Sequence, residues 1–253
     1  MKITIATLFP EMVEGFFASS IMKRAVERGI IDYQIINWRG WAEDRHQSCD
    51  DIPYGGGAGM VITCEPLFKA LDALGATGKR VIYPSPSGRR FDQAYAEDLS
   101  GEEELLFICG HYEGLDQRII DEYVTDEISI GDYVISSGEV ATLVIVDALY
   151  RLIDGVITTD SLEEESFEGG LLEYPQYTRP ATYCSKSVPD VLLGGHHANI
   201  GHWRLQKRIE RSMERRPDLL EVANLDAAGR KILNALVRES AKGNVNDGHN
   251  ESY

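Results

Sequence analysis

The sequence predicts an α/β protein whose strands form a parallel sheet, followed by a smaller and mainly helical domain. Three observations lead to this prediction. Short apolar strands alternate with helical segments in the first part of the chain, a pattern typical of parallel sheets. A polar, acidic segment that ends in two glycines, residues 158–170, then interrupts the alternation. Beyond it, from Asn199 onward, apolar residues recur at helical spacing.

The spacing of apolar residues predicts each element of the first domain in order. Alternation of apolar and polar residues predicts a strand over Ile3–Leu8, and a three-to-four spacing closed by Gly29 predicts a helix over Pro10–Gly29. The remaining elements are strands over 34–38, 80–83, 105–109 and 127–130, and helices over 65–74 and 139–153. We therefore divide the chain into an α/β domain over residues 1–157, a flexible linker over 158–172 and a helical domain over 173–253.

Composition excludes several classes of protein. The chain has 253 residues, of which 43% are hydrophobic and 26% charged, values that exclude a collagen, a coiled coil and a wholly disordered chain. The apolar stretch Val140–Val146 is too short to span a bilayer, and the first residues lack the apolar core of a signal peptide, so we expect a cytoplasmic protein without a membrane partner. The four cysteines form no C-x-x-C pair, which predicts reduced thiols and no zinc site.

Charge is distributed unevenly along the chain. Residues 1–172 hold 13 Lys and Arg against 31 Asp and Glu, a net charge of −18, whereas residues 173–253 hold 12 against 10, a net charge of +2. The overall charge of −16 argues against diffuse binding to nucleic acid. A local basic surface can still bind phosphates, because electrostatic fields decay within roughly 10 Å in salt.

The usual nucleotide-binding and hydrolase motifs are absent from the sequence. The glycine run Gly55–Gly59 does not fit G-x-G-x-x-G, and Gly78-Lys79 lacks the spacing of a P-loop. These mismatches weigh against a Rossmann dehydrogenase, a P-loop NTPase and a Rossmann methyltransferase. Three predicted strands instead run into unusual glycine-containing loops, over 83–89, 109–114 and 130–139. In a parallel sheet such loops gather beyond the carboxyl ends of the strands, so we predict a ligand site there.

One predicted helix in the second domain has a basic face. Its basic side chains recur at i, i+4, i+7 and i+11, with one lysine beside them: Arg204, Arg208, Arg211, Arg215 and Lys207. Another face carries Leu205, Ile209 and Met213, so the helix can dock through this apolar face and present its arginines outward. Such a row suits RNA phosphates, although a solvated charged face has the same pattern.

Six stretches together resemble a known family. They are DDIPYGGGAGM, YPSPSGR, CGHYEGLDQR, ISIGDYVISSGE, YTRP and WRLQKRIERSMERRPDLL, and they occur in the family's order from Met1 to about Leu236. The chain resembles the bacterial tRNA (guanine-N1)-methyltransferases, members of the SPOUT superfamily. The resemblance implies a deep trefoil knot in the α/β domain, which periodicity alone does not indicate. It also implies methyl transfer to N1 of the guanosine at tRNA position 37, immediately 3′ of the anticodon.

The resemblance also implies which residues bind the cofactor and the tRNA. Contacts with S-adenosylmethionine fall on Tyr83, Pro84, Ser85, Pro86, Gly110, Tyr112, Glu113, Ile130, Gly131, Asp132, Tyr133, Val134, Ile135 and Gly138. The Glu113 carboxylate suits an ammonium group or a Mg²⁺ ion, and we expect no metal bound by the protein alone. Contacts with tRNA fall on Asp50, Gly59 and Arg179, in addition to the basic helix.

Two further residues would carry the chemistry. Guanine N1 holds a proton at neutral pH, so a base must remove it, and the family's aspartate before Ser-Phe corresponds here to Glu165. Arg151 matches an arginine beside the target base, where a guanidinium can stabilise charge on O6. The family works as a homodimer whose active site lies at the subunit interface. Two alternatives remain open at this point: a SPOUT ribose 2′-O-methyltransferase and a non-catalytic RNA-binding module.

Overall fold

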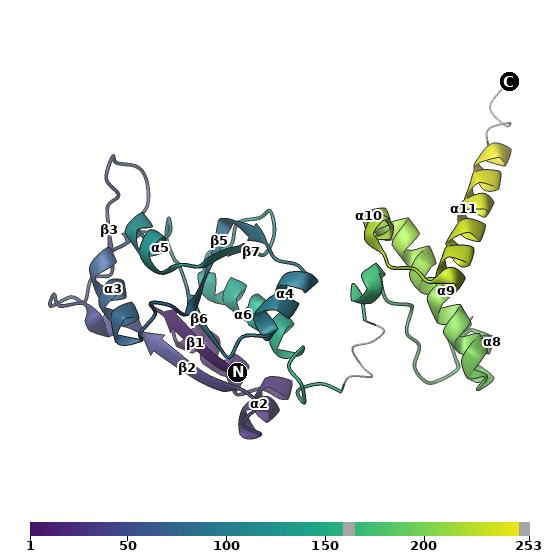
Figure 1. Cartoon of the computed structure of the whole chain (residues 1–253), viewed down its shortest axis with the longest axis horizontal. Helices are drawn as coiled ribbons and strands as arrows, with labels where there is room; N and C mark the ends of the chain where they lie inside the picture. Colours follow the sequence, from purple (N-terminus) through teal and green to yellow (C-terminus); the bar gives the residue numbers. More distant parts are fainter. Residues whose placement is uncertain (159–164, 248–253) are drawn as a thin grey trace. The chain divides into compact units, whose positions relative to one another are not determined.

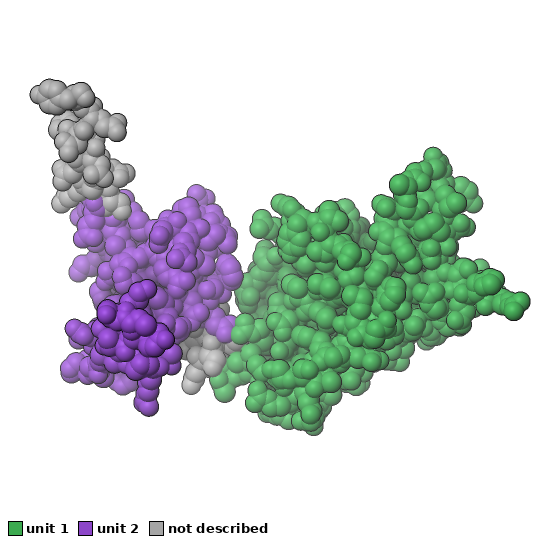
Figure 2. Space-filling view, turned by 180° about the vertical axis from the view of Figure 1, so that it is seen from behind, with its two compact units in different colours: residues 1–158 green, residues 159–253 purple. Residues whose placement is uncertain are grey.

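The chain folds into two compact units. The computed structural model describes residues 1–158 and 165–247. Unit 1 comprises Met1–Thr158 and unit 2 comprises Thr159–Tyr253, coloured separately in Figure 2. The linker expected over 158–172 falls partly outside the described residues, and its last part, 165–172, belongs to unit 2.

Unit 1 is built on a five-stranded sheet in the order β2-β1-β6-β5-β7. All four neighbouring pairs are parallel, which confirms the predicted α/β class with a parallel sheet. The register places Ile3 beside Tyr33 on one side and beside Leu105 on the other. The strands are β1 (Lys2–Thr7), β2 (Asp32–Asn37), β5 (Arg80–Arg90), β6 (Glu104–Ile108) and β7 (Asp126–Ser129).

Helices cover both faces of this sheet (Figure 1). In β6, Leu105 and Phe107 join one buried cluster, whereas Leu106 and Ile108 join the other, because successive side chains of a strand point to opposite faces. The first cluster packs under α1 (Glu11–Phe17), α2 (Ser20–Glu27), α4 (Gln93–Ser100) and α6 (Gly138–Tyr150). The second packs under η1 (Trp38–Trp41), α3 (Cys64–Ala73) and α5 (Gln117–Tyr123).

The first predicted helix is wrong in one respect, because residues 10–29 form two helices. The chain turns extended at Ser19, with φ −126° and ψ 152°, between α1 and α2. The Ser19 hydroxyl donates a hydrogen bond to the carbonyl of Gly15 at 2.6 Å. Serine competes in this way for backbone hydrogen bonds, which explains why the apolar spacing continues while the helix does not.

Strand β5 is much longer than the predicted 80–83. It pairs with β7 twice, since Pro84 and Arg89 both lie opposite Ile128, and the four residues between them loop out. A Cβ atom at Gly88 would collide with the backbone of Glu127 and Ile128, so only glycine fits where the strand returns. This loop, Ser85–Gly88, begins beside the candidate site described below.

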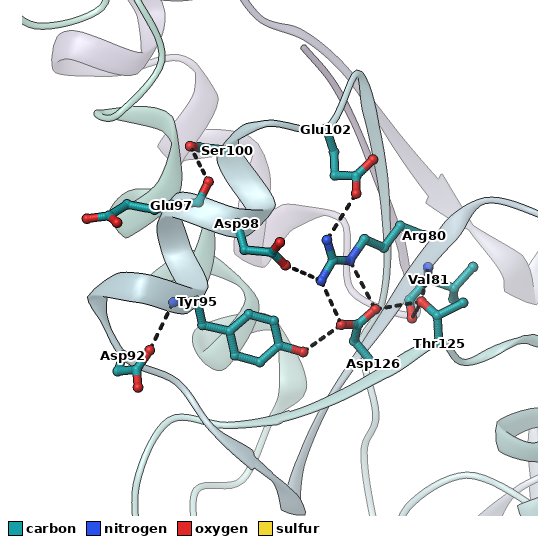
Figure 3. A network of polar contacts seen from close by, with 10 residues as sticks. All are labelled: Arg80, Val81, Asp92, Tyr95, Glu97, Asp98, Ser100, Glu102, Thr125 and Asp126. Carbon is teal, nitrogen blue, oxygen red and sulfur yellow. Dashed lines mark hydrogen bonds and ion pairs between the residues drawn. The ribbon is translucent and has the colours of Figure 1, made fainter.

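Arg80 lies at the centre of a polar network that fastens α4 to strands β5 and β7 (Figure 3). Its guanidinium donates hydrogen bonds to Asp126 at 3.0 and 3.2 Å, to Asp98 at 2.6 Å and to Glu102 at 3.0 Å. The Tyr95 hydroxyl donates to Asp126 at 2.6 Å. The Asp126 side chain is only 13% exposed, so this carboxylate depends on its partners.

We expect Asp126→Asn to lower the free energy of unfolding by about 1–3 kcal/mol, because the neutral amide replaces a charged acceptor. Burial alone would raise the pKa of Asp126, but hydrogen bonds from Arg80, Tyr95 and Thr125 outweigh it and hold the pKa below its ordinary 3.8. A lowered pKa stabilises the fold above about pH 4, and this contribution is lost as the pH falls through the folded-state value. Urea unfolding of both proteins between pH 3 and 7 measures the difference.

Glu97→Gln is the matched control, since Glu97 lies on the same helix with its carboxylate outside the network (Figure 3). It should leave the free energy of unfolding within about 0.5 kcal/mol of wild type. If Asp126→Asn kept the wild-type dependence of stability on pH, Asp126 would not be held in its charged form by this network.

Unit 2 is mainly helical from His197 onward. Its helices are α8 (Asp190–Leu193), α9 (His197–Arg215), α10 (Pro217–Val222) and α11 (Ala227–Asp247), preceded by η2 (Glu168–Gly170) and the hairpin of β8 (Thr182–Tyr183) and β9 (Lys186–Ser187). The predicted apolar face of α9 does dock: Leu205, Ile209 and Met213 pack with Leu171 and Ile232 in the core of this unit. None of the helices in the described ranges is long and apolar enough to cross a membrane.

Candidate functional site

A cavity of about 260 Å³ in unit 1 is lined by the loop within β5 and by the loops that follow the carboxyl ends of β6 and β7. The loops are the ones singled out in the sequence, and a parallel sheet places such loops at one edge. The lining residues are Tyr83–Pro86, Gly110–Gly114, Ile128–Gly131, Tyr133–Gly138 and Ala141. These include every residue expected to contact the cofactor except Asp132, which is exposed beside the cavity.

Main-chain contacts between glycines close one wall of the cavity. The N–H of Gly138, the first residue of α6, donates to the carbonyl of Gly110 at 2.8 Å. A Cβ atom at Gly138 would lie 2.6 Å from the Gly110 nitrogen, and one at Gly110 would lie 2.9 Å from the Tyr83 ring. Because neither position has room for a side chain, a ligand would meet backbone groups at these two places.

Two tyrosines, Tyr83 and Tyr112, also line the cavity. Tyr83 is buried, and burial raises the pKa of its hydroxyl. Tyr112 has a φ of 57°, a left-handed conformation that costs about 1–3 kcal/mol for a residue other than glycine and that recurs in functional sites. Burial raises the pKa of Tyr112, and the nearby Asp50 carboxylate raises it further. Both phenols therefore stay protonated at neutral pH.

A buried carboxylate that the sequence analysis missed supports the floor of the cavity. Glu139, in the first turn of α6, is fully buried. It accepts a hydrogen bond from the Thr7 hydroxyl at the end of β1, and its other oxygen lies 2.7 Å from His111 Nε2. His111 lines the cavity and its ring packs 4.5 Å from that of Phe9. These contacts therefore link β1, the loop after β6 and α6. The sequence signal that could have identified this carboxylate is a charged residue, Glu139, in the first turn of an otherwise apolar helix.

The charges of the lining favour a cationic group over a phosphate. Glu113 is the one carboxylate among the lining residues, and no lysine or arginine is among them. Glu113 is held in place by its backbone, whose N–H donates to the carbonyl of Met60 at 3.0 Å. A ligand with an ammonium or sulfonium group fits this lining, as S-adenosylmethionine would. Within the described residues, no three His, Cys, Asp or Glu side chains cluster to hold a metal ion alone.

The two residues expected to act on the target base lie in different units. Arg151 follows the last residue of α6 in unit 1. Glu165 lies in unit 2, where its carbonyl accepts a long hydrogen bond of 3.5 Å from Arg208. The segment after it is anchored, because the Ser166 hydroxyl accepts from the Glu173 N–H at 3.0 Å and Leu171 is buried in the core.

The basic row of α9 is less exposed than the sequence pattern indicates. The Arg204 guanidinium lies 4.7 Å from the centre of the Tyr174 ring, and Arg208 Nε donates to the Leu172 carbonyl at 3.4 Å. Lys207 pairs with Glu210 at 2.5 Å. Arg215 is exposed, whereas Arg211 is half-buried and its Nε atom is buried without a hydrogen-bond partner within the described part of the chain. Arg215 is therefore the member of the row best placed to meet another molecule, and Arg211 lies about one turn before it on the same helix.

The other residues expected to contact tRNA lie in two places. Asp50 begins the short hairpin of β3 (Asp50–Asp51) and β4 (Val61–Ile62) and lies near Tyr112. Gly59 is in the same hairpin, packed against the Glu113 side chain. Arg179 lines a second cavity, of about 840 Å³, within unit 2 together with Tyr177, Leu192 and others.

Comparison with known proteins agrees with the expectation from the motifs. The family model described as tRNA (Guanine-1)-methyltransferase TrmD matches residues 1–222. A protein of Treponema denticola named tRNA (guanine-N(1)-)-methyltransferase is 63% identical over 223 residues, which cover 88% of this chain and 92% of that protein. A protein of the same name from Treponema pallidum is 54% identical over 239 residues, which cover 94% of this chain and 96% of that protein. Another from Borreliella burgdorferi is 53% identical over 221 residues, which cover 87% of this chain and 92% of that protein.

Proposed function

Since this chain belongs to the tRNA (guanine-1)-methyltransferase TrmD family, its activity is methyl transfer to N1 of a guanine in tRNA, and we propose that this guanosine stands at position 37. One observation supports this proposal most directly. Three of the family's motifs, far apart in the sequence, converge on a single cavity whose lining suits a cationic methyl donor. The donor implied by the family is S-adenosylmethionine, and the enzyme would work in the cytoplasm, where it meets tRNA.

The lining residues would bind the donor mainly through the main chain. The backbone of Ile130 to Ile135 would read the adenine edge, with Ile130 and Val134 providing apolar contact. Glu113 would pair with the ammonium group or, with oxygens of the bound substrates, hold a Mg²⁺ ion. When bound, S-adenosylmethionine supplies an electrophilic methyl group. We place this cavity within the deep trefoil knot of the SPOUT enzymes, in keeping with the Gly138–Gly110 contact between distant segments.

Two side chains would carry out the proton chemistry. Glu165 would accept the N1 proton of guanine, because a carboxylate is the base that the interdomain segment offers. Arg151 would hydrogen-bond guanine O6, where negative charge develops as N1 loses its proton. We also propose a homodimer, as the resemblance to the family implies, in which the active site lies at the subunit interface.

Product analysis tests this function against its alternatives. Purified enzyme with labelled S-adenosylmethionine should methylate an unmodified tRNA with guanosine at position 37 and leave one with adenosine there unmodified. The nucleoside formed should be 1-methylguanosine. A 2′-O-methylated nucleoside would indicate the ribose methyltransferase, and cofactor binding without methyl transfer would indicate the RNA-binding module. The names of the relatives favour neither of these alternatives.

We expect the double substitution Arg211→Gln with Arg215→Gln to weaken tRNA binding and to flatten its dependence on salt. Each lost phosphate contact should reduce the slope of log K against log salt concentration by about 0.7–0.9. Affinity for S-adenosylmethionine should not change, because both arginines lie in unit 2. Filter binding of tRNA between 50 and 200 mM salt measures the slope.

Lys23→Gln is the matched control for loss of an exposed cation. Lys23 lies in unit 1, is 56% exposed and pairs with Glu27 at 3.7 Å, and its loss should leave the slope unchanged. If the double variant kept the wild-type slope, the row on α9 would be a solvated face and the phosphate contacts would lie elsewhere.

A further inference from the structure

The hairpin of β3 and β4 carries an unusually exposed aromatic side chain. Its tip, residues 52–59, projects from unit 1 beside the β3 label in Figure 1. Tyr54 is fully exposed, more than any other large hydrophobic side chain in the described part of the chain. Ile52, in the same tip, is 69% exposed. The other exposed aromatic side chains of the described part of unit 1, Tyr112 and Tyr133, line the cavity, whereas Tyr54 is not among its lining residues. The exposed ring of Tyr54 is therefore available to a molecule that lies outside the cavity.

The base of this hairpin is fastened to the wall of the cavity. The Met60 carbonyl accepts from the Glu113 N–H, and the Gly114 carbonyl accepts from the Ile62 N–H, both at 3.0 Å. Gly59 packs so closely against the Glu113 side chain that a Cβ atom would collide with it. Both Glu113 and Gly114 line the cavity, so the hairpin tip begins at its rim.

Chain length limits how far Tyr54 can lie from that rim. The ladder between β3 and β4 ends at the pair Asp51–Val61, and Tyr54 is three residues beyond it. A chain segment of three residues spans at most about 10 Å. Tyr54 therefore stays within reach of the nucleotides next to a base that meets the methyl donor at the rim of the cavity.

The chemistry of the tip suits a nucleobase and not a phosphate. Residues 50–60 include two aspartates and no lysine or arginine, so they offer no cation to a phosphate. Unpaired bases in RNA loops stack on aromatic side chains, and a base leaving the stack exposes the faces of its neighbours. Gly55, Gly56 and Gly57 all have positive φ angles and give the tip a conformation that side chains would disfavour.

We propose that Tyr54 stacks on the nucleobase beside the target guanine and holds the anticodon loop open while that guanine lies against the methyl donor at the mouth of the cavity. This inference rests on the proposed function, because it takes the anticodon loop as the substrate. It adds a nucleobase-binding residue outside the cofactor cavity. This residue would contribute to tRNA affinity by stacking and not by pairing with phosphate charges.

The experiment measures tRNA affinity and kcat/KM for wild type, Tyr54→Phe and Tyr54→Ala. Loss of one stacking interaction should weaken binding by the alanine variant roughly 5–100-fold, and Tyr54→Phe should stay close to wild type. The salt slope and the affinity for S-adenosylmethionine should not change, because stacking releases no counterions. Thermal unfolding should also be unchanged, since the ring makes no contact that folding depends on.

An abasic nucleotide on either side of the target guanine completes a double-mutant cycle with Tyr54→Ala. At one of the two positions, the abasic site should weaken binding to wild type but add little in the alanine variant. Equal losses in both proteins at both positions would overturn the proposal, as would wild-type affinity in Tyr54→Ala. Wild type on intact tRNA is the reference for the proposed function itself: if it formed no 1-methylguanosine, the function would fail independently of Tyr54.

Discussion

Replacement of Glu165 by glutamine should lower the rate of methyl transfer roughly 10²–10⁴-fold, the usual effect of losing a general base. Glutamine keeps the size and hydrogen-bonding capacity of the side chain but cannot accept the N1 proton. The loss corresponds to about 3–5 kcal/mol in the activation free energy. Single-turnover transfer at saturating tRNA and S-adenosylmethionine isolates this step from binding and from product release.

Affinity for tRNA should change little in the same variant, because the surrounding segment is held by contacts of Ser166 and Leu171 that the substitution leaves intact. Glu165→Asp should retain substantial activity, since it keeps the carboxylate. Glu173→Gln is the matched control: this neighbouring carboxylate accepts from Gln176 at 2.6 Å, and its neutralisation should leave the rate unchanged. A wild-type rate in Glu165→Gln would assign the base to another residue.

Gly138→Ala should weaken S-adenosylmethionine binding at least tenfold and lower the free energy of unfolding by about 1–3 kcal/mol, the usual cost of overpacking. The added methyl group would lie 2.6 Å from the Gly110 nitrogen, 3.0 Å from its oxygen and 3.1 Å from the Cys109 carbonyl carbon. All three are backbone atoms, so α6 or the loop after β6 must move, and both line the cavity. Isothermal titration with the cofactor and urea unfolding measure the two effects.

Gly15→Ala separates this effect from the general consequences of replacing a glycine. Gly15 lies within α1, and a Cβ atom there would meet nothing within 4 Å. That substitution should stabilise the protein by about 0.4–1 kcal/mol and leave cofactor affinity unchanged. Wild-type cofactor affinity in Gly138→Ala would mean that the Gly138–Gly110 contact does not shape the binding surface.

The sequence was most informative where burial imposes a regular pattern. Strands such as β1 and β6 are buried on both faces, and their apolar residues marked them clearly. Helices α4 and α5 were not predicted, although their capping aspartates stand in the sequence: Asp92 accepts from the Tyr95 N–H at 2.9 Å and Asp116 from the Arg118 N–H at 3.0 Å. Both helices are short, so the caps carry more information than the apolar spacing.

Other features depend on contacts between distant segments. The predicted strand ended at Tyr83, yet β5 resumes its pairing with β7 beyond the loop, which local propensity does not reveal. The burial of Glu139 depends on Thr7, 132 residues earlier in the chain. The loops of the cavity were recognised because each followed a predicted strand. The contacts of Glu139 with Thr7 and His111 were not, because these residues lie far apart in the sequence.

The glycine contacts at Gly110 and Gly138 also bear on how the enzyme would respond to a competitive inhibitor. Resistance usually arises when a side chain that touches the inhibitor is exchanged for one that excludes it. At Gly110 and Gly138 a ligand would meet the main chain, and these two positions have no room for a larger residue. An inhibitor that bonds to these backbone groups would leave few substitutions able to exclude it without also excluding the methyl donor. Escape would then have to arise from increased enzyme abundance or decreased uptake.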